Sequence, residues 1–196
     1  MITQIAQLLK KHLQGYEASV PEEELMQLSA QFTLKTFAKR DIVFSQTEVC
    51  KEVLLVEEGI LASEFTQPDK TVISRFFRPA NLCSNLVSVI QQTLASDNIM
   101  AITPVTSLSI PYHLFYQYYL HSSTFGIFLR KKLLENMVEA KHFISIKTIS
   151  DTEAKYQFLE TNYPKIIRDT PSKYIANFLG ITPEALSRFL ARRYKS

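Results

Sequence analysis

The segment Thr170–Lys195, TPSKYIANFLGITPEALSRFLARRYK, decides how the C-terminal part of the chain folds, because it contains a Thr-Pro pair twice. Threonine is a favourable cap at the start of a helix, and proline fits the first helical turn, where its missing N–H costs nothing. We therefore expect Thr170 to cap a helix that begins at Pro171, and Thr182 to cap a second helix that begins at Pro183.

The residues between the two helix starts are typical of a tight turn. Gly180 permits the positive φ that such a turn requires. Ala176 is small where two crossing helices would approach each other, and Ile181 and Leu186 are apolar where the pair must pack. An Ala, a Gly four residues later and an apolar residue six further on give the spacing of a helix-turn-helix, a motif that binds DNA. Helical hairpins with a glycine in the turn also occur in proteins that never touch DNA.

The second helix of this pair is expected to read the major groove of double-stranded DNA. Arg188 can donate to O6 and N7 of guanine, and Glu184 can accept from N4 of cytosine. The basic residues nearer the chain end suit phosphate contacts, which give affinity without sequence information. The other interpretation of each charge is a solvated helix face. The residues expected to contact DNA are Lys173, Thr182, Pro183, Glu184, Ser187, Arg188, Arg192, Arg193 and Lys195.

The positive charge of the chain is concentrated in this region. Residues 164–196 contain seven basic and two acidic side chains, a net charge of +5, whereas the whole chain carries +3. The other 163 residues therefore sum to −2. A basic unit on a slightly acidic body suits a polyanion as the partner of the C-terminal part, and a solvated basic tail is the alternative.

The region between residues 32 and 111 has the texture of a β domain. Short β-like runs are separated by turn residues, and one turn contains Pro68 and Asp69. Several short strands at this spacing favour an antiparallel sandwich or barrel. Residues 86–92 fit a short helix, and two helices are expected before this region. The expected strands are 32–38, 41–46, 52–58, 59–65, 71–77, 98–102 and 106–111.

A long helical pattern covers residues 124–147 and carries two apolar stripes. The first stripe steps by four, four, three and four residues, so its members line one face. Ile127, Leu134 and Val138 form the second stripe. Two apolar stripes indicate two neighbours, which we expect to be the β domain and a second copy of the helix in a dimer, although the core helix of a monomer also fits. The expected dimer interface is the first stripe, Leu129, Leu133, Met137, Ala140 and Ile144.

Several classes of protein are not expected. No window approaches about 18 consecutive apolar residues and the N-terminus lacks the features of a secretory signal, so we expect no membrane partner. Cys50 and Cys83 allow no disulfide framework and no four-thiolate site. The histidines are scattered with no carboxylate at ligand spacing, so we expect neither catalysis nor a cofactor. A cytoplasmic protein with two reduced thiols is the economical interpretation.

Taken together, these parts resemble the CRP/FNR family of bacterial transcription regulators. The similarity spans nearly the whole chain and is strongest in IANFLGITPEALSRFLARR, while VLLVEEGILASEF, with Gly59 at a turn, gives weaker support. The resemblance implies an α+β protein with an antiparallel, jelly-roll-like β-roll of the cyclic-nucleotide-binding type, a long connecting helix and an all-helical C-terminal helix-turn-helix domain. The implied boundaries are 1–122 for the sensor domain with its N-terminal helices, 123–148 for the dimerisation helix and 149–196 for the DNA-binding domain.

The resemblance also bears on the bases that would be read. Glu184 and Arg188 fall on base-reading positions of the family. Pro183 stands where the family has a further base-reading arginine, so the target sequence of better known members is not carried over to this chain.

Two departures from the family pattern concern the ligand. Cyclic-nucleotide binders of this fold carry a Gly-Glu pair for the ribose and an Arg followed by Ser or Thr for the cyclic phosphate. Cys83-Ser84 and Ala95-Ser96 stand at these places, and no arginine occurs between Arg78 and Arg130. Because burying a phosphate without a cation is costly, cyclic AMP binding in the usual mode is not expected. The alternatives left open are a β-roll that binds another small effector, at Cys83, Ser84, Asn85 and Ser96, and a β-roll that binds nothing.

The sequence thus predicts a dimeric, sequence-specific DNA-binding regulator whose β-roll responds to an unidentified small effector. The resemblance adds RNA polymerase as a candidate partner. The alternative is a β-roll sensor or binding module whose C-terminal helices bind a protein partner, in which case binding would not depend on Arg188.

Overall fold

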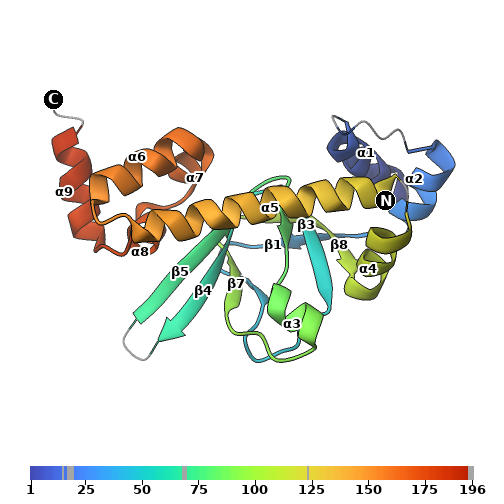
Figure 1. The fold of residues 1–196 in the computed structure, drawn as a ribbon, viewed down its shortest axis with the longest axis horizontal. Helices are drawn as coiled ribbons and strands as arrows, with labels where there is room; N and C mark the ends of the chain where they lie inside the picture. Colours follow the sequence, from blue (N-terminus) through green and yellow to red (C-terminus); the bar gives the residue numbers. More distant parts are fainter. Residues whose placement is uncertain (15, 17–19, 68–69, 123, 194–196) are drawn as a thin grey trace.

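The structure is a computed structural model, in which residues 1–14, 16, 20–67, 70–122 and 124–193 are described. The helices are α1 (Ile2–Leu13), α2 (Glu22–Ser29), α3 (Leu86–Gln91), α4 (Tyr112–His121), α5 (Phe125–Thr148), α6 (Thr152–Asn162), α7 (Pro164–Asp169), α8 (Ser172–Leu179) and α9 (Pro183–Arg193). The strands are β1 (Thr33–Phe37), β2 (Ile42–Phe44), β3 (Glu52–Glu58), β4 (Leu61–Gln67), β5 (Lys70–Phe77), β6 (Leu82–Cys83), β7 (Asn98–Ala101) and β8 (Val105–Pro111). Figure 1 shows α5 running across the β domain, with α1, α2 and α4 at one of its ends and α6–α9 at the other.

The strands form two antiparallel sheets with the orders β1-β8-β3-β6 and β2-β7-β4-β5. The two sheets pack face to face. Since successive side chains of a strand point to opposite faces, every second residue of a strand points towards the other sheet. The space between them is filled by apolar side chains that include Leu54 of β3, Leu61 of β4, Phe77 of β5 and Ile99 of β7. The expected α+β chain with an antiparallel, jelly-roll-like β domain is confirmed.

The seven expected strands correspond to β1–β5, β7 and β8, with some shifted ends. The sequence pattern does not predict β6, since this two-residue strand is defined by its pairing with β3 and not by a β-like run. The turn residues Pro68 and Asp69 lie outside the described residues, and Gln67 and Lys70 pair on either side of them.

Gly59 joins β3 to β4 with a backbone that only glycine adopts easily. Its φ is +84°, and a Cβ atom placed on it would lie 2.1 Å from the carbonyl oxygen of Pro104. The turn expected at this glycine is therefore confirmed, and both the backbone angle and the lack of space explain why no side chain stands there.

The first half of α5 packs among the helices that precede it. Phe125 and Phe128 stack with their ring centroids 5.5 Å apart, and they share a core with Leu9 of α1, Leu28 of α2 and Phe115 of α4. This core covers the outer face of the β1-β8-β3-β6 sheet. The sheet contributes Val53, Leu55 and Leu108 to it.

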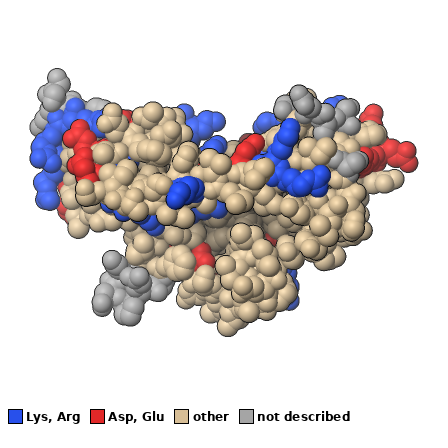
Figure 2. Space-filling view, viewed as in Figure 1, with Lys and Arg blue, Asp and Glu red and all other residues tan. Residues whose placement is uncertain are grey.

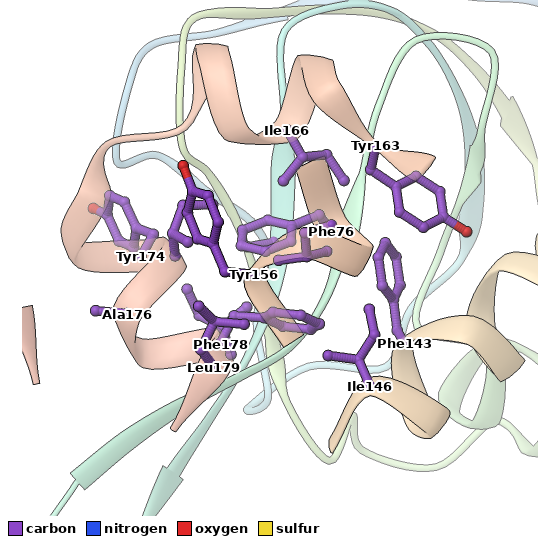
Figure 3. Close-up of a cluster of buried hydrophobic side chains, with 14 of the residues drawn as sticks. Phe76, Phe143, Ile146, Tyr156, Tyr163, Ile166, Tyr174, Ala176, Phe178 and Leu179 are labelled. Atoms are coloured by element: carbon purple, nitrogen blue, oxygen red, sulfur yellow. The ribbon is translucent and has the colours of Figure 1, made fainter. Parts of the chain in front are cut away.

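The C-terminal helices share a second core with the other sheet (Figure 3). The ring of Phe76 in β5 lies 6.5 Å from that of Phe143 in α5 and 5.2 Å from that of Phe178 in α8, measured between centroids. The rings of Phe143 and Phe178 are 5.5 Å apart. Packing is thus continuous across residue 149, where a domain boundary was expected. The boundary itself stays a prediction. None of the helices in the described part of the chain is both long and apolar enough to span a bilayer.

Candidate nucleic-acid interface

The turn between α8 and α9 closes as the sequence predicts. Gly180 has φ 76° and ψ 27°, and its N–H donates to the carbonyl of Asn177 at 3.1 Å. The N–H of Ile181 donates to the carbonyl of Ala176 at 3.0 Å, which completes a Schellman motif. Oγ1 of Thr182 accepts from the backbone N–H of Ala185 at 3.1 Å, so the predicted cap of the second helix is confirmed.

The prediction that Thr170 caps the first helix is wrong. The helix α8 begins at Ser172, one residue later than expected, with Pro171 at the capping position. Thr170 is therefore too far from the first free N–H groups of the helix, and its Oγ1 is buried without a hydrogen-bond partner in the described structure.

The helix α9 has one buried and one exposed face. Leu186 and Phe189 are 1% and 9% exposed and pack into the core shared with β5. Glu184 and Arg188, one turn apart, lie on the opposite face. Hydrogen bonds from its own backbone N–H and from Thr182 lower the pKa of Glu184, so this carboxylate is ionised. The exposed members of the expected DNA-contacting set are Lys173, Thr182, Pro183, Glu184, Ser187, Arg188 and Arg192.

The basic residues near the end of α9 differ in their surroundings. Arg193 pairs with Glu160 of α6, with Nη2 and Oε2 at 2.7 Å, and its guanidinium lies over the rings of Tyr156 and Phe189. These contacts make Arg193 a residue that holds α9 on α6, whereas the sequence suggested a phosphate contact. Arg192 is exposed, and Lys195 lies outside the described residues. Figure 2 shows basic side chains gathered over the α9 end of the molecule.

The pair α8–α9 is fixed to the β2-β7-β4-β5 sheet through α8. Lys173 lies at the exposed start of α8, with Nζ 4.6 Å from the centroid of the Tyr174 ring. One turn further along α8, the amide of Asn177 bonds to the backbone of β5. From α5, Nζ of Lys147 donates to the carbonyl of Ile73 in the same strand at 3.0 Å. The sequence pattern gives no sign of this attachment.

The apolar residues of α5 divide between two faces in a way that differs from the expected stripe. Leu129 is 2% exposed and belongs to the core of its own subunit, so it is unavailable to a second copy. Leu133 and Ala140 are partly buried, whereas Met137 and Ile144 are 66% and 60% exposed. The second stripe of the sequence also faces outward. The exposed apolar residues of α5, here called the α5 stripe, are Ile127, Leu134, Met137, Val138 and Ile144.

The four residues expected to line an effector pocket differ in their surroundings. Cys83 is fully buried, and burial raises the pKa of its thiol well above the usual value. Ser84 donates to the carbonyl of Glu52 at 3.0 Å. Asn85 and Ser96 both donate to Oδ1 of Asp97, at 2.7 and 2.9 Å. A buried carboxylate thus holds the hydroxyl that the resemblance would assign to a cyclic phosphate, and its charge would repel such a ligand.

A polar network joins the loop after β5 to α5. Oε1 of Glu139 accepts from Nε of Arg78 at 2.8 Å, and Oε2 accepts from Nδ2 of Asn81 at 2.8 Å. Nδ2 of Asn136 donates to the carbonyl of Leu82 at 2.6 Å. Two successive turns of α5 are therefore tied to the segment that leads into α3. No cluster of three potential metal-ligating side chains occurs in the described structure.

Comparisons with known proteins agree with this geometry. Residues 34–122 match the family model described as cyclic nucleotide-binding domain. A mutant of CooA from Carboxydothermus hydrogenoformans is similar in structure, with 16% identity, a TM-score of 0.66, and coverage of 93% of this chain and 82% of that chain. FixK2 from Bradyrhizobium japonicum is similar with 14% identity, a TM-score of 0.66, and coverage of 84% and 85%. A CRP-family transcriptional regulator from Thermus thermophilus has 15% identity, a TM-score of 0.65, and coverage of 82% and 84%. No curated protein sequence matches the chain.

The chain therefore has the fold of the CRP/FNR transcription regulators, and the resemblance drawn from its sequence is confirmed at this level. Within that fold, the segment from β1 to α4 is the part that matches the cyclic nucleotide-binding domain family, and α5–α9 lie beyond the match.

Proposed function

We propose that the protein is a dimeric, sequence-specific DNA-binding transcription regulator of the CRP/FNR type in the cytoplasm, whose β-roll responds to a small effector. The pair α8–Gly180–α9 carries this proposal. Its second helix is anchored by Leu186 and Phe189 and turns Glu184 and Arg188 to solvent. A helix anchored on one side and exposed on the other, with basic residues at its end, fits the major groove.

Each exposed residue has a role in this proposal. Arg188 reads guanine and Glu184 reads cytosine through their hydrogen-bonding groups. Lys173, Arg192 and Lys195 contact phosphates and fix the position of the helix on the duplex. Thr182, Pro183 and Ser187 lie close to the same groove, and Arg193 supports α9 through Glu160.

The α5 stripe supports the dimer. Its members are 40–66% exposed, and two pairs among them, Ile127 with Leu134 and Met137 with Ile144, are seven residues apart, the repeat of a coiled-coil seam. Such large apolar side chains exposed on one face of a long helix favour pairing with a second copy of that helix. A two-fold dimer would place its recognition helices in half-sites about one helical turn apart.

The effector of this proposal is not a cyclic nucleotide bound in the usual mode. Ala95 offers no cation for the phosphate, and the Asp97 carboxylate occupies the hydroxyl of Ser96. A change in the β-roll can reach the DNA-binding helices through α5 and through Asn177, and an effector shifts the two arrangements only as far as it binds them differently.

The test is a selection of random duplexes with the purified full-length protein. We expect enrichment of a pseudo-palindrome whose half-sites are roughly 34–36 Å apart. The variant Arg188→Ala is expected to lose that enrichment at one base pair of each half-site. If the wild-type protein enriches no motif, the proposed function is wrong, and a module whose C-terminal helices bind a protein partner takes its place.

A further inference from the structure

A cavity of about 150 Å³ lies between β5, α3 and α5. Most of its wall is apolar, with Phe77, Leu82, Val89 and Phe115 among the side chains that line it. An apolar cavity of about this volume in another protein takes up a benzene molecule. The space therefore suits one small apolar group.

One charged side chain, Arg75 of β5, lines this cavity. Its guanidinium lies 4.6 Å from the centroid of the Phe77 ring, and Nη2 donates to the backbone carbonyl of Asn136 at 3.3 Å. Its Nε is buried and has no hydrogen-bond partner among the described residues. Burial lowers the pKa of Arg75, as it does for a cation that has lost part of its water.

No described carboxylate forms an ion pair with Arg75. Glu139 is the carboxylate whose charge acts on Arg75, but both of its oxygens are already engaged, by Arg78 and Asn81. A partly buried cation without a counter-ion of its own thus borders an apolar space. Such an arrangement is costly unless an anion completes it.

We propose that this cavity binds a small monocarboxylate with an apolar body, whose carboxylate pairs with Arg75. This inference rests on the proposed function and names the class of its effector. A guanidinium donates two parallel hydrogen bonds to a carboxylate, and the single long bond to Asn136 leaves the Arg75 side chain free to turn towards one. The apolar body fills the remaining space, and the single cation matches a single negative charge.

The position of the cavity links such a ligand to α5. Leu133, Asn136, Met137 and Ala140 of α5 line it together with Leu86 of α3. A ligand in the cavity would contact both α5 and the β-roll. Its affinity would therefore change if α5 shifted relative to the β-roll, and its binding would favour one position of α5.

The test uses the full-length protein with phenylacetate and hexanoate as probes and their uncharged amides as controls, followed by calorimetric titration and thermal shift. We expect saturable binding of the acids and not of the amides. Arg75→Gln is expected to weaken the acids by about tenfold or more, and Arg75→Lys by less. Ala140→Leu fills the cavity without changing its charge and is expected to abolish binding. The control Arg168→Gln removes an exposed arginine elsewhere, which pairs with the exposed Asp169, and is expected to leave acid binding unchanged.

Three results would overturn the proposal. Equal binding of acids and amides would show that Arg75 holds no carboxylate, and binding of cyclic AMP that requires Arg75 would assign the cavity to a nucleotide. Absence of acid binding, with Ala140→Leu instead weakening the dimer in sedimentation, would assign it to a side chain of a second copy. DNA selection without any acid is measured in parallel, so failure of this inference and failure of the proposed function are separate outcomes.

Discussion

Asn177 in α8 bonds to the edge strand of the β2-β7-β4-β5 sheet, where its Oδ1 accepts a hydrogen bond from the backbone N–H of Ile73 at 2.6 Å. Its Nδ2 donates to the carbonyl of Thr71 two residues away. The strand β5 is the last in its sheet, so these backbone groups have no neighbouring strand to pair with. The side chain satisfies both, and α8, the first helix of the proposed DNA-binding pair, is thereby attached to the β-roll.

Replacing Asn177 by Ala is expected to lower the free energy of unfolding by about 1–2 kcal/mol, since two hydrogen bonds are lost. The backbone amide of Ile73 should also exchange its hydrogen faster. Denaturant unfolding and hydrogen exchange measure the two effects. The matched control is Asn162→Ala, which removes an amide that bonds only within its own helix. Equal effects of the two variants would contradict the proposed attachment.

Replacing Arg188 by Ala is expected to weaken binding to the selected duplex by about 1–3 kcal/mol and to relax the preference at one base pair. Lys195→Ala should weaken selected and scrambled duplexes alike, because phosphate contacts carry no sequence information. Fluorescence anisotropy with both duplexes at fixed salt separates the two cases. If the Arg188→Ala variant binds both duplexes as the wild type does, the proposed contact between Arg188 and DNA is wrong.

The two glycines with positive φ provide a matched pair of variants. Gly180→Ala is expected to cost about 1–2 kcal/mol for the left-handed backbone alone, since a Cβ there meets no atom within 4 Å. Gly59→Ala should cost more, because its Cβ would also collide with the carbonyl of Pro104. Urea unfolding of both variants measures the difference. Equal stabilities would mean that the β3–β4 turn relaxes without cost.

Tyr163 is expected to make stability depend on pH in the alkaline range. Burial raises the pKa of Tyr163 to about 12 from a model-compound value of 10.0. Between these two values the unfolded chain loses the phenol proton and the folded chain keeps it, so the free energy of unfolding falls as pH rises. Tyr163→Phe should remove this part of the slope. Urea unfolding of both proteins from pH 9 to 12, roughly the window around these pKa values, tests it, and parallel slopes would count against it.

Charges on the α5 stripe are expected to separate the dimer. The double variant Leu134→Glu, Val138→Glu places two acidic side chains in the proposed seam, where like charges from both copies would meet. We expect a monomer in sedimentation at micromolar concentration and a weaker, unpaired interaction with DNA. Gln117→Glu adds an exposed charge on α4 and serves as the control. A double variant that sediments as the wild type does would place the dimer contact elsewhere.

The secondary structure could largely be predicted because its signals are local. The exposed face of α9 follows from the helical period once Leu186 and Phe189 are assigned to the core, and this places Glu184 and Arg188 opposite them. The turn at Gly180 and the cap at Thr182 rest on neighbours a few residues away, and both are confirmed.

Two predictions were wrong at particular residues, Thr170 and Leu129, because a local pattern allowed more than one arrangement. The stripe from Leu129 to Ile144 runs along the border between the two faces of α5, so its members divide between the core and the exposed side. A Thr-Pro pair marks a helix start only to within a residue, and at Thr170 the start falls one residue later.

The contacts that join the parts of the molecule could not be read from the sequence. Asn177 and Ile73 are 104 residues apart, and Arg75 meets the backbone of Asn136 at a separation of 61 residues. No local sequence pattern predicts the partner of a single Asn in a helix or a single Arg in a strand, because that partner depends on how the elements pack.

The core that joins Phe76, Phe143 and Phe178 has a practical consequence for dissecting this protein into fragments. A fragment that stops at the end of α5 would lay Phe76 and Phe143 bare, and an isolated α6–α9 fragment would do the same to Phe178. Each fragment would expose an apolar surface that is buried in the intact chain. We therefore expect both fragments to aggregate before their separate activities could be assayed. Point variants, not truncations, are therefore the way to test the proposed effector binding and DNA binding separately.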